Sequence, residues 1–474
     1  MADSFTSQIF RRMPVGRQPH TEEGLKRTIG LVQLVGFGVG ATVGTGIFFV
    51  LTTAVPDAGP AVVVSFVIAA VTAGLTALCY AELAGSVPVS GSSYSYAYAT
   101  LGEVVAMIVA ACLLLEYGVS ASAVAVGWSE YLNQLLDNLF GVQIPHDLSY
   151  APEAGGIVNL PAMILVALCA LLLIRGASES AVVNTVMVAI KVGVLVLFVV
   201  IAATGWNTDN LADFAPFGLA GIQAASATIF FSYIGLDAVS TAGDEVKDPA
   251  RTMPRAIILS LIIVSTLYVA VALTAVAAQP WEDFEGQQAG LAQILENVTG
   301  STWPSTVLAA GAVVSIFSIT LVVLYGQTRI LFTMGRDRML PPIFARVNPR
   351  TLTPVPNTII VATVVALIAG FVPLEWLLDT VSIGTLVAFM VVAAGVIILR
   401  RRAPDLERSF KVPLYPVLPL LSIAACIYVI TGLELVTWLV FLAWVAVALA
   451  FYFSYGFKHS TLRRPTGEDE AVVP

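Results

Sequence analysis

The stretch AVVNTVMVAIKVGVLVLFVVIAAT, residues 181–204, carries a single charged residue, Lys191, in the middle of an apolar run. A run of ~20 apolar residues has the length of a helix that crosses a lipid bilayer. Lys191 lies about ten residues from the nearer end, or ~15 Å along a helix, which is farther than a lysine side chain of roughly 6 Å can reach. The stretch therefore predicts a membrane helix, and Lys191 is a candidate functional residue because a charge at that depth costs about 3 kcal/mol or more.

Apolar runs of similar length recur along the whole chain. The 474 residues are 58% hydrophobic and 11% charged, whereas an ordinary soluble protein has about 25% charged residues. The runs fall near residues 30–53, 60–86, 103–128, 157–175, 181–204, 221–243, 255–278, 305–332, 357–372, 380–399, 414–432 and 437–456. They predict an all-α membrane protein with about twelve transmembrane helices.

The basic residues orient these helices in the membrane. Lys191 is one of 23 Lys and Arg, and the other 22 fall in the two tails or in connections on one side, whereas the opposite connections hold acids but no Lys or Arg. Since Lys and Arg concentrate in cytoplasmic loops, residues 1–28 and 457–474 are predicted to be cytoplasmic tails of a multi-pass protein of the cell (inner or plasma) membrane. The net charge of -8 disfavours binding to nucleic acid.

The first run is a poor continuous helix at its centre. Residues 36–48 read GFGVGATVGTGIF, with five glycines in the first eleven positions. Three of these glycines are spaced for a packing stripe, Gly36, Gly40 and Gly44. Gly38 and Gly46 lie off that face, so the favoured interpretation is an unwound segment whose backbone N–H groups hold a carboxylate at the start of a half-helix. Packing and unwinding are compatible with each other.

The sixth run has a similar weak point in ATIFFSYIGLD, residues 227–237. A break near Gly235 would leave three backbone carbonyls to accept from an ammonium group, those of Phe230, Phe231 and Ile234. Phe231 would then cover the site, and Asp237 lies too deep for a surface group. Interrupted helices at matching positions of two halves indicate the substrate site of a transporter.

Two other acids lie in apolar runs. Glu116, in CLLLEYGVSASA, forms either a buried ion pair with Lys191 or part of a site for substrate or protons, and the sequence leaves both open. Glu82, near the end of the second run, is predicted to be structural and to help close an inner gate. The runs contain no histidine, and the chain has no HExxH or GxSxG motif; we therefore expect neither an enzyme nor a metal or cofactor.

Four segments, in order, resemble the amino acid–polyamine–organocation superfamily, and within it the bacterial relatives of the cationic amino acid transporters. They are GATVGTGIF (residues 40–48), LLLEYGVSASAVAVGWSEYL (113–132), FFSYIGLDAVSTAGDEVKDPARTMPRAI (230–257) and YGQTRILFTMGRDRMLPPIFARVNPRTLTPVPN (325–357). The resemblance implies a leucine-transporter-type fold with discontinuous helices 1 and 6. Its five-helix inverted repeats would span residues 29–204 and 221–400, followed by two helices in 412–456.

The resemblance also implies a binding site. The substrate α-carboxylate would meet the backbone of five residues, Thr42, Val43, Gly44, Thr45 and Gly46. Its α-amine would meet the carbonyls of Phe230, Phe231 and Ile234, with Asp237 close by. Its side chain would point toward Glu116 and Val119 and toward residues 316–320. Lys191 would replace the sodium ion of other relatives, and would bond carbonyls near Gly40 and the hydroxyl of Ser315 or Ser318.

These implications describe a secondary active transporter of L-amino acids that works by alternating access, is independent of sodium and is coupled to protons. An exchanger, or a transport-inactive amino acid sensor of the same fold, is the alternative. The sequence leaves open whether the substrate is small and neutral or cationic, and whether a small membrane protein packs against the outer helices. The expected partners are the substrate, protons and the lipid bilayer.

Overall fold

The computed structural model describes residues 11–12, 29–44, 46–86, 92–176, 181–235, 239, 246–351, 353–406, 408 and 410–460. Within these ranges the chain is helical, and its only β-type pairing is an isolated bridge between Ile29 and Val246. The prediction of an all-α protein is therefore confirmed for the described part of the chain.

The main α-helices of the described chain follow one another in sequence order. They are α2 (Leu31–Thr42), α3 (Val50–Ala58), α4 (Val62–Ser86), α5 (Ser92–Thr100), α6 (Glu103–Phe140), α7 (Leu160–Ile174), α8 (Ala181–Ala202), α9 (Gly218–Ile229), α11 (Pro249–Ala278), α12 (Gly290–Thr299), α13 (Thr302–Arg336), α14 (Val355–Phe371), α15 (Leu374–Arg402), α16 (Val417–Ile430) and α17 (Leu435–Phe451). The chain continues through a π-helical turn, Tyr452–Gly456, into the short α18 (Phe457–His459).

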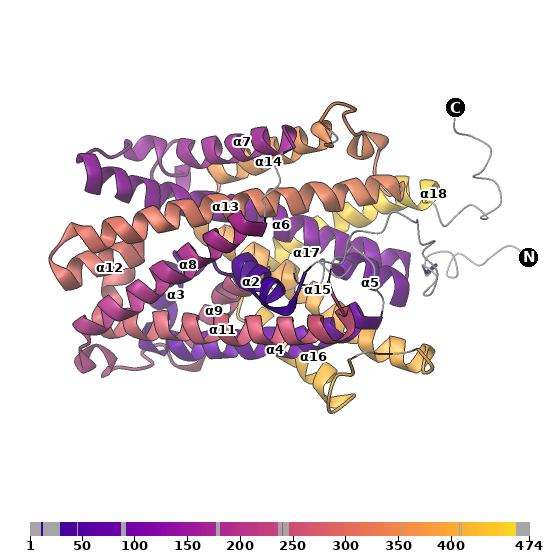
Figure 1. Ribbon diagram of the computed structural model, residues 1–474, viewed down its shortest axis with the longest axis horizontal. Coiled ribbons are helices and arrows are strands. Elements are labelled where there is room, and N and C mark those ends of the chain that lie inside the picture. Colours follow the sequence, from indigo (N-terminus) through magenta and orange to yellow (C-terminus); the bar gives the residue numbers. More distant parts are fainter. Residues whose placement is uncertain are drawn as a thin grey trace, which may run out of the picture.

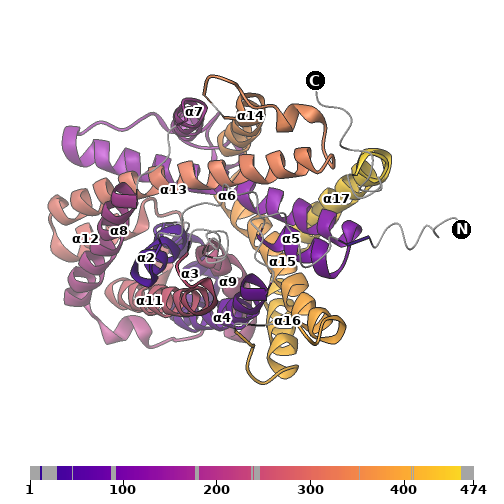
Figure 2. The ribbon, with the colours of Figure 1, turned by 45° about the vertical axis from the view of Figure 1, so that its right-hand side comes forward.

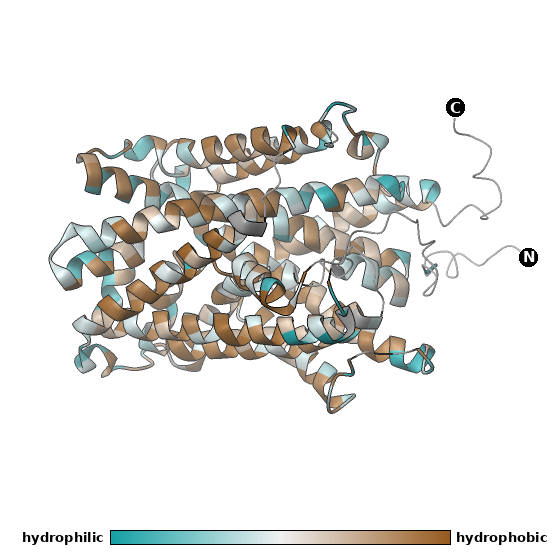
Figure 3. Cartoon of the chain, in the orientation of Figure 1, coloured by the Kyte–Doolittle hydropathy of each residue, from teal (hydrophilic) through white to brown (hydrophobic). Residues whose placement is uncertain are grey.

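Seven helical segments of the described chain are long and apolar enough to cross a membrane, and four shorter helices, α2, α7, α14 and α16, are also apolar. The first long segment, Val50–Ala84, joins α3 to α4 through a short 3₁₀ turn. Figure 3 shows hydrophobic residues along the middle of the long helices and hydrophilic residues gathered near their ends. This distribution is that of a multi-pass membrane protein.

The long helices run roughly along one direction (Figure 1). In Figure 2, the short helices α2, α3 and α9 lie inside a group formed by α4, α6, α8, α11, α13 and α15. Helix α6 packs against α13 and α15, and α11 packs against α2 and α4. The short helices of the first and sixth predicted spans are thus enclosed by long ones, which keeps their broken ends away from lipid.

A buried ion cluster ties α4 to the end of α15. Glu82 is 1% exposed and accepts hydrogen bonds from Arg400 Nε and Nη2 at 2.7 and 2.5 Å and from the Val412 N–H at 2.7 Å. Arg408 Nε lies 3.4 Å from the same carboxylate. Two guanidinium groups and a backbone donor thus surround the Glu82 carboxylate, and its predicted structural role agrees with these contacts. Its predicted part in an inner gate stays a prediction.

Candidate substrate and coupling site

The first predicted span is broken at its centre. Helix α2 ends at Thr42, Val43 is extended with φ −70° and ψ 119°, and α3 begins only at Val50. Gly44 has φ +112°, a conformation that side chains disfavour and glycine adopts readily. The interruption predicted from the glycine content is confirmed. Thr45, one of the predicted carboxylate contacts, lies outside the described residues.

The glycines of this segment do not form the stripe that their spacing indicated. A methyl group added at Gly36 would meet no atom within 4 Å, whereas one at Gly38 would lie 2.5 Å from Ser260 Oγ. One added at Gly46 would lie 2.6 Å from Ser232 Oγ. The prediction of a packing stripe was wrong because α2 ends before Gly44, so that the three glycines do not share one face of a continuous helix.

The sixth span is broken in the same region of the molecule. Helix α9 ends at Ile229, a 3₁₀ turn covers Phe230–Tyr233, and Ile234 is extended with ψ 144°. Gly235 follows with φ +94°, and a methyl group there would lie 2.5 Å from the Ala41 carbonyl oxygen. The two breaks therefore touch through their backbones. Asp237 lies outside the described residues.

Lys191 reaches the broken end of α2 from α8. Its Nζ donates to the Gly40 carbonyl oxygen at 3.0 Å, and the residue is 2% exposed. A methyl group at Gly44 would lie 3.8 Å from the same Nζ. The expected contact near Gly40 is present, and the ammonium lies where the carbonyls and dipole of a helix C-terminus favour a cation. Ser315 donates its hydroxyl to the Gly311 carbonyl at 2.5 Å within α13.

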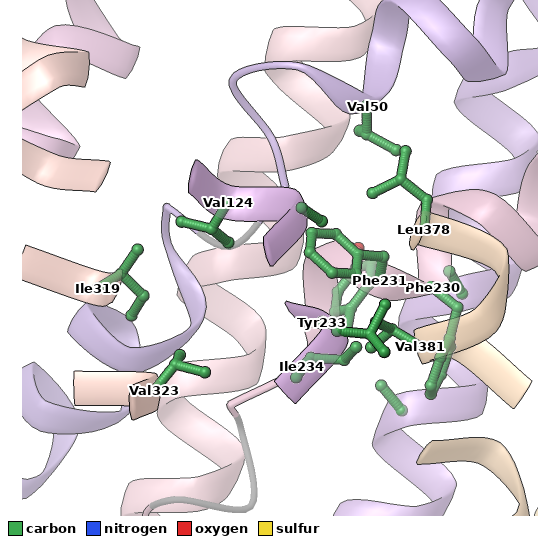
Figure 4. Close-up of a cluster of buried hydrophobic side chains, with 14 of the residues drawn as sticks. Val50, Val124, Phe230, Phe231, Tyr233, Ile234, Ile319, Val323, Leu378 and Val381 are labelled. Atoms are coloured by element: carbon green, nitrogen blue, oxygen red, sulfur yellow. The ribbon is translucent and has the colours of Figure 1, made fainter. Parts of the chain in front are cut away.

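Aromatic and aliphatic side chains fill the space around the two breaks (Figure 4). The Phe231 ring lies 6.0 Å from that of Phe49, and the Phe230 ring 5.7 Å from that of Phe389. The prediction that the Phe231 carbonyl is left without an internal donor is wrong, because the 3₁₀ turn lets the Ile234 N–H donate to it at 3.2 Å.

The acid predicted on the third span is buried as well. Glu116 is 2% exposed on α6, three residues before Val119. In the same stretch, Gln327 of α13 donates its side-chain amide to the Leu114 carbonyl at 3.2 Å. Whether Glu116 pairs with Lys191 or faces a substrate stays a prediction.

Sequence reasoning missed two tyrosines that bond the broken first span. The Tyr268 hydroxyl of α11 donates to the Thr42 carbonyl at 2.9 Å, and the Tyr131 hydroxyl of α6 donates to the Phe48 carbonyl at 2.5 Å. Both residues are fully buried. The available signal for Tyr268 was its place inside the apolar run 255–278, because a buried hydroxyl needs a hydrogen-bond partner. Tyr131 follows the run 103–128 and carried no such signal.

Residues 29–456, which include all of these elements, match the family model described as amino acid permease. The chain belongs to the amino acid permease family of the amino acid–polyamine–organocation superfamily. The match covers both broken spans and the helix that carries Lys191. The resemblance noted in the sequence is confirmed, and the permease is a transport protein rather than an enzyme.

Several similar proteins span most of this permease. A methylthioribose transporter of Bacillus subtilis (strain 168) is 40% identical over 97% of this chain and 100% of its own length. The branched-chain amino acid permease BcaP of the same organism is 42% identical over 94% of this chain and 96% of its own length. The vacuolar cationic amino acid transporter 4 of Arabidopsis thaliana is 36% identical over 80% of this chain and 64% of its own length.

Proposed function

We propose that this permease is a secondary active transporter of L-amino acids that is coupled to protons through Lys191 and needs no sodium. The observation that carries the proposal is the 3.0 Å bond from the buried Lys191 Nζ to the Gly40 carbonyl at the broken end of α2. A fixed ammonium there supplies the positive charge that a metal cation would otherwise bring, and unlike a metal it can release a proton in place.

In this proposal, the first and sixth spans are matching parts of two inverted repeats, residues 29–204 and 221–400, within a twelve-helix fold whose termini are cytoplasmic. Protonated Lys191 ties α2 to α8. Loss of the proton removes the charged donor and frees the helices of the broken spans to move against α6, α8 and α13. Alternating access then follows from the bonding and release of one end of α2.

The substrate backbone is proposed to bind between the two breaks. Its carboxylate would meet the backbone of residues 42–46, where the N-terminus of α3 adds the positive end of a helix dipole. Its ammonium would meet the carbonyls at Phe230 and Ile234, with Asp237 nearby. The support for this arrangement is the contact of the breaks, since a methyl group at Gly46 would lie 2.7 Å from the Phe231 ring.

The side chains around the breaks favour a small or branched apolar substrate. Figure 4 shows Val124 of α6 with Ile319 and Val323 of α13 on one side and Phe231 and Ile234 on the other, all of them buried. Such a surface stabilises a neutral aliphatic side chain and leaves a cationic one without water. The similarity to a protein named as a branched-chain amino acid permease agrees with this preference.

Uptake into proteoliposomes tests the proposal. Radiolabelled leucine is supplied in sodium-free buffer, with and without an inward proton gradient, and is competed with alanine, valine, arginine and methylthioribose. We expect leucine to accumulate only with the gradient, and the neutral amino acids to compete best. A sodium requirement would contradict the coupling, exchange without net uptake would indicate an exchanger, and stronger competition by arginine or methylthioribose would overturn the substrate class.

A further inference from the structure

Three side-chain donors from three different helices bond carbonyls close to the break in the first span. Lys191 of α8 bonds the Gly40 carbonyl at 3.0 Å, Tyr268 of α11 bonds the Thr42 carbonyl at 2.9 Å, and Tyr131 of α6 bonds the Phe48 carbonyl at 2.5 Å. The first two hold the end of α2. Tyr131 alone among these three holds the far end of the broken segment, just before α3 begins.

Tyr131 lies where three parts of the chain meet. Its ring packs edge-on against the Phe48 ring, with 5.9 Å between the centroids. The adjacent Glu130 carboxylate accepts the Ala289 N–H at 3.4 Å, one residue before α12. A methyl group at Gly290, the first residue of α12, would lie 2.6 Å from Thr52 Cγ2 of α3. The start of α3 and the start of α12 therefore pack against each other and against α6 at this point.

The two tyrosine bonds differ in what they join. Helix α11 packs along α2 and α4, so the Tyr268 bond lies inside the group of helices that carries the broken spans. Helix α6 packs along α13 and α15, so the Tyr131 bond connects the broken span to the surrounding long helices. If these groups move relative to one another, the Tyr268 bond persists and the Tyr131 bond has to break.

We propose that Tyr131 is a positioning residue for transport, whose hydroxyl holds the start of α3 against α6 while the junction with α12 is closed and releases it when that junction opens. The inference rests on the proposed function, because it takes movement of the broken spans against α6 as the transport step. It assigns Tyr131 no contact with the substrate and no part in proton transfer.

Cysteine accessibility tests this inference without any transport measurement. Leu291, 1% exposed in the first turn of α12, is replaced by cysteine as a reporter, and all four native cysteines are buried. The rate of labelling by a membrane-impermeant maleimide is measured in the L291C protein and with Y131F or Y268F added. We expect Y131F to raise the labelling rate about three- to tenfold, the range of one hydrogen bond, and Y268F to leave it unchanged.

Equal labelling rates in Y131F and in the parent, or an equal rise in Y268F, would overturn the inference. A second variant, Gly290→Ala, pushes on Thr52 from the α12 side and is expected to raise labelling as well; if Y131F fails to fold, an unchanged rate in G290A overturns the inference. In uptake assays, Y131F should change the KM and maximal rate for leucine but keep the pH profile. If the proposed proton coupling is wrong, the pH profile of the parent protein will differ from the expected one, whereas the labelling result will be unaffected.

Discussion

Two charged side chains are buried in this permease in different ways. Glu82, near the end of α4, is surrounded by the guanidinium groups of Arg400 and Arg408 and by a backbone N–H. Lys191 donates to a neutral carbonyl, that of Gly40, at the end of a broken helix. Removing the charge of Glu82 would leave two partly buried guanidinium groups without their counter-ion. In the proposed mechanism, loss of the proton from Lys191 instead weakens its bond to the Gly40 carbonyl. The first arrangement suits a permanent connection and the second a switch.

The largest effect is expected from Lys191→Ala. The variant lacks the charged donor that bonds Gly40, so a proton gradient no longer drives accumulation of leucine in proteoliposomes. The free energy of unfolding should stay within about 1 kcal/mol of the parent, because the change also removes a charge from a costly environment. Uptake against a gradient and thermal stability in detergent measure the two parts.

The matched variant Lys191→Arg keeps the charge and cannot release a proton at physiological pH. It should therefore bind substrate without proton-driven accumulation. Accumulation by K191A or K191R under a pH difference would show that Lys191 does not carry the proton coupling, and would remove the distinction between the two regions.

The second-largest effect is expected from the removal of Glu82, the residue that is paired with two arginines. Glu82→Ala should lower the stability by about 3–5 kcal/mol, toward the low end because the Arg400 side chain is 17% exposed. Thermal unfolding monitored in detergent measures the loss. The double replacement of Glu82 and Arg400 by apolar residues is the control, since removing both partners should recover part of the stability. A wild-type melting temperature in E82A would show that this cluster carries no structural role.

The comparison also explains what the sequence could and could not predict. The depth of Lys191 in its run and the breaks at Gly44 and Gly235 are local features, because charge and backbone freedom belong to single residues. The bond from Arg400 to Glu82 joins residues 318 positions apart, and the Tyr131 bond joins residues 83 apart. Such pairs depend on how the helices pack, so the sequence marked Glu82 without its partners and did not mark Tyr131.

The prediction of a packing stripe failed because it assumed a structure that the local pattern alone does not determine. Gly36, Gly40 and Gly44 share a face only if the helix continues, and the same glycine content that suggested the stripe also ends α2 at Thr42. A pattern that assumes a regular helix fails where the function requires a break.

The third effect tests the contact between the two breaks. Gly235→Ala adds a methyl group 2.5 Å from the Ala41 carbonyl oxygen at a residue with φ +94°, so the backbones have to move apart. We expect the uptake of leucine to fall about tenfold or more, in line with a strain of ~1–3 kcal/mol. Gly36→Ala is the matched control, because its methyl group meets no atom within 4 Å and should leave uptake unchanged. Equal uptake by both variants would show that the contact between the two breaks is not part of the transport site.

The smallest effect is expected from a third ionisable side chain, that of Asp337, which is partly buried. Asp337 follows α13, and burial raises its pKa, while the hydrogen bond from the Tyr94 hydroxyl at 3.2 Å and the charge of Arg336 oppose the rise. Since the pKa in the folded state exceeds the ordinary value of about 3.9, ionised Asp337 lowers the stability at neutral pH, and this cost disappears as the pH falls below that value.

Asp337→Asn should therefore raise the stability at neutral pH by less than ~1 kcal/mol, with a gain that shrinks on acidification. Thermal unfolding of D337N and the parent across this pH range measures the difference. A loss of stability at neutral pH would instead place Asp337 with Glu82, as an acid that its neighbours hold in the ionised form.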